Sequence, residues 1–111
     1  MPVEPSNSTV FPGRRTKGTA VNFAINYDLK KPGRDYDGLH TAIKSLGDWW
    51  HYLGSTWLVD CALDANAIFE RLRPHLDGSD RVLVIRVARD YQGWLEPEAW
   101  EWVNQRTYAA A

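Results

Sequence analysis

The residue best placed to do chemistry is Asp28, which follows the apolar run FAINY at the point where the chain leaves a predicted strand. Loops at the ends of strands often carry functional groups. Lys30, Lys31 and Arg34 come directly after this carboxylate and could contact phosphate. The Asp28 oxygens could bind a divalent cation such as Mg²⁺, which polarises a phosphodiester or activates water. The alternative is an aspartate that ends the strand and bonds to its own turn.

A single carboxylate is too few for a tight metal site. A two-fold dimer that brings two copies of Asp28 together would supply two carboxylates on one axis. A chain of 111 residues also buries only a modest part of its surface, so it gains from covering more apolar area in a dimer. The hypothesis of a metal site at Asp28 therefore requires a homodimer.

The other titratable residues give weaker signals. Asp60 lies within the apolar segment TWLVDCAL, so it is paired, on a solvated face, or beside a site. His40, His51 and His75 have no metal-ligand spacing and no serine or cysteine nucleophile near them in sequence. The single cysteine, Cys61, excludes an intramolecular disulfide and is expected to be a buried thiol.

The aromatic residues indicate a contact surface. The chain has six Trp and five Tyr but only three Phe, and Trp is favoured at interfaces. Trp100 and Trp102 fall on different faces of the predicted last helix. We therefore expect these two residues to lie at an interface with a partner or with a second copy.

Hydrophobic periodicity predicts the elements that position these residues. In chain order they are a strand in 19–29, a helix in 35–47, hairpin strands in 49–53 and 56–63, a helix from Asp64, a strand in 81–88 and a last helix from 96. Asp35 or Asp37 is expected to cap the first helix and Gly47 to end it. Pro74 should end or kink the second helix, and a short extra strand is expected in 89–95.

This order predicts an α+β fold of the ferredoxin-like βαββαβ type. Two βαβ units with right-handed crossovers form a four-stranded antiparallel sheet with two helices on one face, and the last helix is a C-terminal appendage. We expect one domain in 20–111 and a disordered tail in 1–19, where Pro, Gly, Ser and Thr are frequent and apolar residues show no period.

Composition limits the possible partners. The chain has 13 basic and 14 acidic residues and a net charge of −1, so no global positive field attracts nucleic acid, and RNA or DNA would need a local patch. No stretch approaches the roughly 18 apolar residues of a membrane span. The start of the chain lacks the features of a signal peptide. We expect a cytoplasmic protein with no membrane partner.

Four segments taken in order, FAINYDL, STWLVDCAL, IFERL and DRVLVIRV, resemble the small CRISPR-associated endonucleases that partner the spacer integrase. They are also similar to the virulence-associated protein D ribonucleases. The shared motifs are a Tyr-Asp after the first strand, a Ser or Thr that opens the third, and an Asp-Arg before the last. The resemblance covers residues 20–88. It implies a ferredoxin-like homodimer in which Asp28 is the metal-binding or catalytic residue.

Two functions remain open. The first is a homodimeric nucleic-acid-associated protein, a metal-dependent nuclease on RNA or DNA in which Asp28 of each subunit binds Mg²⁺ while Lys31 and Arg34 contact phosphate. The second is a non-catalytic interaction or scaffold module of a prokaryotic defence or toxin–antitoxin system. In that case Trp100 and Trp102 would help to dock an integrase or another protein. The near-neutral charge favours the second function, and the position of Asp28 favours the first.

Overall fold

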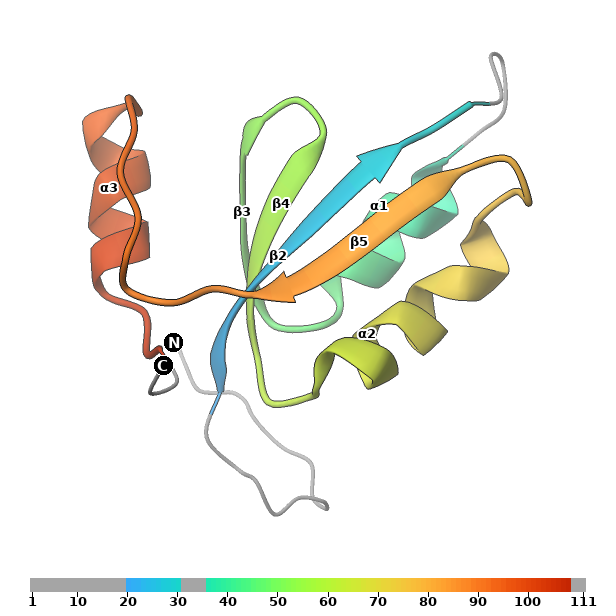
Figure 1. Ribbon diagram of the computed structural model, residues 1–111, viewed down its shortest axis with the longest axis horizontal. Coiled ribbons are helices and arrows are strands. Elements are labelled where there is room, and N and C mark those ends of the chain that lie inside the picture. Colours follow the sequence, from blue (N-terminus) through green and yellow to red (C-terminus); the bar gives the residue numbers. More distant parts are fainter. Residues whose placement is uncertain (1–19, 31–35, 109–111) are drawn as a thin grey trace.

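The computed structural model describes residues 20–30 and 36–108. The predicted tail in 1–19 lies outside the described residues, as do Lys31, Arg34 and residues 109–111. Within the described part, one four-stranded antiparallel sheet is combined with three α-helices (Figure 1). The predicted α+β class and the antiparallel four-stranded sheet are therefore confirmed.

The elements follow the predicted order. They are β2 (Val21–Asp28), α1 (Asp37–Lys44), β3 (Asp48–Leu53), β4 (Thr56–Cys61), α2 (Ala65–Leu72), the 3₁₀ turn η2 (Arg73–His75), β5 (Arg81–Arg86) and α3 (Pro97–Asn104). The order of strands across the sheet is β3-β4-β2-β5, and every neighbouring pair is antiparallel. β2 and β4 are therefore interior strands, whereas β3 and β5 form the edges among the described strands.

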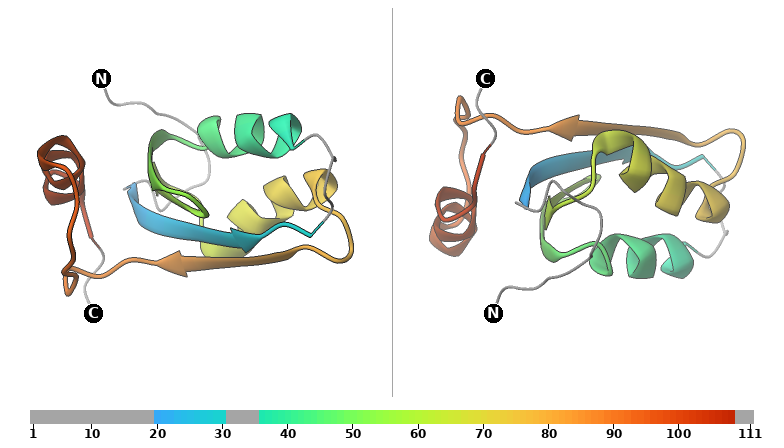
Figure 2. Two further views of the ribbon diagram at one scale, coloured as in Figure 1. Left: turned by 90° about the horizontal axis from the view of Figure 1, so that it is seen from above. Right: turned by 90° about the horizontal axis from the view of Figure 1, so that it is seen from below.

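Helices α1 and α2 lie on the same side of the sheet (Figure 2). The alternation along β2 directs Phe23 and Ile25 to this side, where both are fully buried. They pack against apolar side chains of the two helices and of β4. The buried residues of this main core are Phe23, Ile25, Leu39, Ile43, Trp57, Val59, Cys61, Ile68 and Leu72. Each large side chain contributes roughly 2 kcal/mol by burial before entropy is counted.

The opposite side of the sheet, which we call the outer face, carries one apolar row across all four strands. In the strand register, Trp50 lies opposite Leu58, Leu58 opposite Ala24, and Ala24 opposite Ile85. Opposed residues on neighbouring strands share a face and contact each other. We call these four residues the apolar row.

Polar side chains flank the apolar row on both sides. On one side, Thr56 Oγ1 donates to Asn26 Oδ1 at 2.9 Å. On the other side, Asp48 lies opposite Asp60, and Asp60 lies opposite Asn22. The apolar row therefore has polar residues on both sides, and Leu83, opposite Asn26, adds an exposed apolar side chain on one of them.

Helix α3 covers only the β3–β4 half of the apolar row. Ala99 and Val103 are buried against Trp50, and Trp50 Nε1 donates to the Ala99 carbonyl oxygen at 3.3 Å. On the other half, Ile85 is 46% exposed, and Leu83 next to the row on β5, opposite Asn26, is 59% exposed. We call this uncovered part, formed by β2 and β5, the open half.

The prediction for the end of the first helix was wrong, and the prediction for its start falls partly outside the described residues. The residue before α1 is Tyr36, which makes no side-chain capping hydrogen bond, while Asp37 is the first helical residue and Asp35 lies outside the described residues. The helix ends at Lys44, three residues before Gly47. Gly47 is needed for a different reason, because a Cβ atom there would overlap the carbonyl oxygen of Asp60.

Predictions for the later segments had mixed outcomes. Asp64 caps α2 by accepting from the Ala67 N–H at 2.8 Å, as predicted, and η2 replaces the helix at Pro74. The predicted extra strand in 89–95 was wrong, since the chain is irregular from 87 to 96. No helix of the described residues is long and apolar enough to cross a membrane.

Candidate functional site

Asp28 is the last residue of β2 and lies opposite Arg81 on β5. Its side chain is 66% exposed, and Lys30 Nζ forms an ion pair with its Oδ2 atom at 2.7 Å. An ion pair exposed to this degree contributes little to stability. The Asp28 carboxylate is thus accessible from solvent, with a cation beside it.

A second carboxylate at this end of the sheet, Asp80, is buried. Its Oδ1 atom accepts hydrogen bonds from the Lys30 N–H and the Tyr36 hydroxyl, both at 2.8 Å. Its Oδ2 atom accepts from the Asp77 N–H at 2.8 Å. Asp80 therefore joins the end of β2, the start of α1 and the turn before β5.

The different partners of the two carboxylates decide what this end of the sheet can do. The oxygens of Asp80 face protein donors, whereas Asp28 faces solvent. Among the residues that the structure describes, no group of three His, Cys, Asp or Glu side chains could hold a metal ion. Of these two carboxylates Asp28 is the accessible one, and a Mg²⁺ ion held by it would need further ligands from a second copy or from a substrate.

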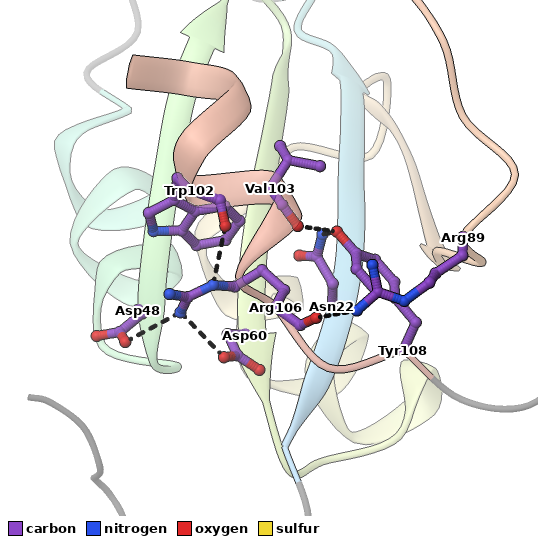
Figure 3. A network of polar contacts seen from close by, with 8 residues as sticks. All are labelled: Asn22, Asp48, Asp60, Arg89, Trp102, Val103, Arg106 and Tyr108. Atoms are coloured by element: carbon purple, nitrogen blue, oxygen red, sulfur yellow. Dashed lines mark hydrogen bonds and ion pairs between the residues drawn. The ribbon is translucent and has the colours of Figure 1, made fainter. Parts of the chain in front are cut away.

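A polar network on the outer face joins the C-terminal segment to the sheet (Figure 3). Arg106 Nη1 donates to Asp60 Oδ2 at 3.1 Å and to Asp48 Oδ2 at 3.3 Å, and Arg106 Nε donates to the Trp102 carbonyl oxygen at 3.1 Å. Burial raises the pKa of Asp60 above its usual value, and Arg106 opposes this shift only in part. Asp60 is therefore paired, which is one of the three possibilities that the sequence left open.

Asn22 and Tyr108 form the second part of this network. The Tyr108 hydroxyl donates to the Val103 carbonyl oxygen at 2.7 Å and accepts from Asn22 Nδ2 at 3.0 Å. Burial, more than any other cause, raises the pKa of Tyr108 to about 12, so the hydroxyl keeps its proton. Within the described residues, two buried acceptors, Asn22 Oδ1 and Asp60 Oδ1, have no hydrogen-bond partner.

The two predicted interface tryptophans are both half-buried. The Trp100 ring stacks on Tyr91 with 6.2 Å between ring centroids, and the Arg106 guanidinium lies over Trp102 at 4.5 Å. Trp94, between β5 and α3, is 98% exposed. Nothing in the sequence distinguished it from the other five tryptophans. Each ring of Trp100 and Trp102 therefore has a partner within its own chain.

The histidines of α1 and β3 contribute to packing. His51 stacks on the buried Trp57 with 3.8 Å between centroids, and His40 lies 5.7 Å from the same ring. Trp57 Nε1 donates to the Tyr27 hydroxyl at 2.9 Å. Cys61 is buried, and burial raises the pKa of its thiol, which disfavours a nucleophilic thiolate.

Comparisons with known proteins give no relative for this chain. No family model, no curated protein and no solved structure matches it.

The contrast between the two carboxylates predicts different effects on stability. Asp80→Ala leaves three donors without their acceptor, so we expect the free energy of unfolding to fall by about 3 kcal/mol. Asp28→Ala removes an exposed ion pair and should cost less than about 1 kcal/mol. Urea unfolding of both variants measures these changes, and equal losses would contradict the structural role of Asp80.

The raised pKa of Asp60 predicts a pH-dependent effect. The folded state holds the Asp60 proton more tightly than the unfolded chain, whose pKa is near 3.8. The associated stability is present below that pH and is lost as pH rises through the folded-state pKa. Asn at this position does not titrate. As pH rises above about 4, the free energy of unfolding of Asp60→Asn should therefore increase relative to that of the native protein. A difference that stays constant between pH 3.5 and 7 in urea titrations would contradict this.

Proposed function

We propose that this protein acts as a homodimeric protein-interaction module in which a second copy covers the open half of the outer face. The observation that supports this proposal is the uneven covering of the apolar row. Its β3–β4 half is buried under α3, whereas Leu83 and Ile85 on β5 are about half exposed. Neighbouring exposed apolar side chains at a sheet edge are typical of a contact surface.

A second copy fits this surface because a two-fold interface places the same patch on both subunits. Leu83 and Ile85 of one copy would then pack on the same residues of the other, with Ala24 beside Ile85 on the neighbouring strand of each sheet. β5 carries its charged residues, Arg81 and Arg86, at its two ends, so its centre offers only apolar contacts. The short chain gains buried apolar area by such pairing.

We propose a ferredoxin-like arrangement, which the strand order β3-β4-β2-β5 and the position of α1 and α2 on one face support. We also propose a cytoplasmic role in a prokaryotic defence or toxin–antitoxin system, with an integrase or another protein as partner. The resemblance of residues 20–88 to the CRISPR-associated endonucleases supports this role.

The proposed dimer predicts the effect of a charge on the open half. Leu83→Glu places a carboxylate where the two copies would meet, so the dimer should dissociate at least tenfold more readily, since a buried unpaired charge is costly. Sedimentation equilibrium over a concentration series measures this change.

Leu53→Glu is the matched control, because Leu53 is 48% exposed but belongs to β3 at the other edge of the sheet. It should leave the dimer intact. The proposal would be contradicted if the native protein were monomeric at high micromolar concentration, or if the two variants changed the dimer dissociation constant equally.

A second function, a metal-dependent nuclease, is favoured by the exposure of Asp28 at the end of β2. In a homodimer two copies of Asp28 could bind Mg²⁺, which would polarise a phosphodiester of RNA or DNA. Lys30 would then have to move from Asp28 to a substrate phosphate. Lys31 and Arg34 lie outside the described residues, so their contribution stays a prediction.

The nuclease hypothesis predicts that Asp28→Ala abolishes cleavage of single-stranded RNA or duplex DNA in Mg²⁺ or Mn²⁺. Asp90→Ala is the control, since Asp90 is an exposed aspartate between β5 and α3. Cleavage that persists equally in both variants would show that Asp28 is not the catalytic residue.

A further inference from the structure

We propose that residues 97–108 form a releasable cover over the β3–β4 half of the outer face, that Arg106 holds it closed, and that its release exposes the whole apolar row to the second copy. This inference rests on the proposed homodimer, because it concerns how the same face is regulated. We call residues 97–108 the cover.

The cover has its own small apolar cluster, separate from the main core. The buried residues of this cluster are Trp50 of β3 and Ala99 and Val103 of the cover, whereas the main core on the other side of the sheet has nine buried residues. An irregular segment, residues 87–96, links the cover to β5. Elements with few buried apolar contacts open at a lower free-energy cost than the core, and they often open as a unit.

Arg106 carries the main charged contacts between the cover and the sheet. Its guanidinium bonds to Asp60 and Asp48, which come from two neighbouring strands. Its carbonyl oxygen accepts from Arg89 Nη2 at 3.0 Å. The Arg106 side chain is 15% exposed and that of Asp60 is 18% exposed, so solvent screens this ion pair less than a surface pair. Loss of the Arg106 charge should therefore loosen the whole cover.

The closed cover leaves two polar atoms unsatisfied. Asn22 Oδ1 and Asp60 Oδ1 are buried without a hydrogen-bond partner in the described part of the chain, and both side chains bond to the cover through Tyr108 and Arg106. Rotation of the Asn22 amide would not help, because the Tyr108 hydroxyl already donates its proton to Val103. Such atoms make the closed state costly. Release of the cover would let water reach both of them.

Release would also enlarge the surface offered to a second copy. The open half presents mainly Leu83 and Ile85, whereas a typical stable interface buries about 800 Å² on each partner. With the cover displaced, Trp50 and Leu58 would extend the apolar row to all four strands. The cover would then set how strongly two copies associate.

Hydrogen exchange of the full chain, read by mass spectrometry, tests this inference with Arg106→Met. We expect peptides from 97–108 and from β3 to exchange about 10- to 100-fold faster, as loss of charge-assisted hydrogen bonds implies. Peptides from α1, α2 and β5 should keep their native rates. Arg73→Met is the matched control, since Arg73 is 66% exposed and pairs only with Glu70 in the described chain.

The inference would be overturned if Arg106→Met accelerated hydrogen exchange equally in all elements, or if it did not accelerate exchange in the cover. If Arg106→Met fails to fold, the native protein in sub-denaturing urea provides the same test, because the cover should exchange before the main core does. Sedimentation separates the two proposals. If the cover exchanges selectively but the native protein and Arg106→Met both sediment as monomers, the homodimer is contradicted and the releasable cover is not. If the native protein sediments as a dimer but the cover and the main core exchange together, the releasable cover is contradicted and the homodimer is not.

Discussion

β2 pairs with a strand on each side, so both of its faces contribute to the packing of the molecule. Phe23 and Ile25 face the helices and are fully buried in the main core, while Asn22, Ala24 and Asn26 face the other way. Because successive side chains of a strand alternate, a shift of one residue would exchange these two sets. The main core, the apolar row and the polar network around Arg106 therefore all depend on the register of this one strand.

Two carboxylates, the buried Asp80 and the partly buried Asp60, use this frame in different ways. Asp80 has donors on both oxygens, from three separate segments, so its charge is stabilised where it lies. Asp60 shares Arg106 with Asp48, and one of its oxygens has no hydrogen-bond partner among the described residues. Burial without enough donors raises a carboxyl pKa and destabilises the charged form. The network that fastens the C-terminal segment is thus less well satisfied than the one that fixes the end of β2.

This difference bears on the two functional hypotheses. Asp80 organises the Asp28 end of the sheet with its hydrogen bonds, and of these two carboxylates Asp28 is the one that faces solvent. The outer face offers more: an apolar row, half covered by α3, with exposed leucine and isoleucine on β5. Binding of a second copy by this face uses only side chains of the chain itself, whereas catalysis at Asp28 needs a metal ion and a second carboxylate. The geometry therefore favours interaction over turnover.

The sequence by itself determined the order and type of the elements, because the alternation in 21–28 and the three- and four-residue spacing in 37–44 and 65–72 report local burial. It also determined the Asp64 cap and the break at Pro74, which are local effects. It could not place Gly47 against Asp60, Asp80 against Tyr36, or Arg106 against Asp60, since these contacts join residues between 13 and 46 positions apart. Only the tertiary structure decided which face α3 covers, and so which tryptophans have partners. Periodicity tells which side of an element is apolar, but not which other element lies against it.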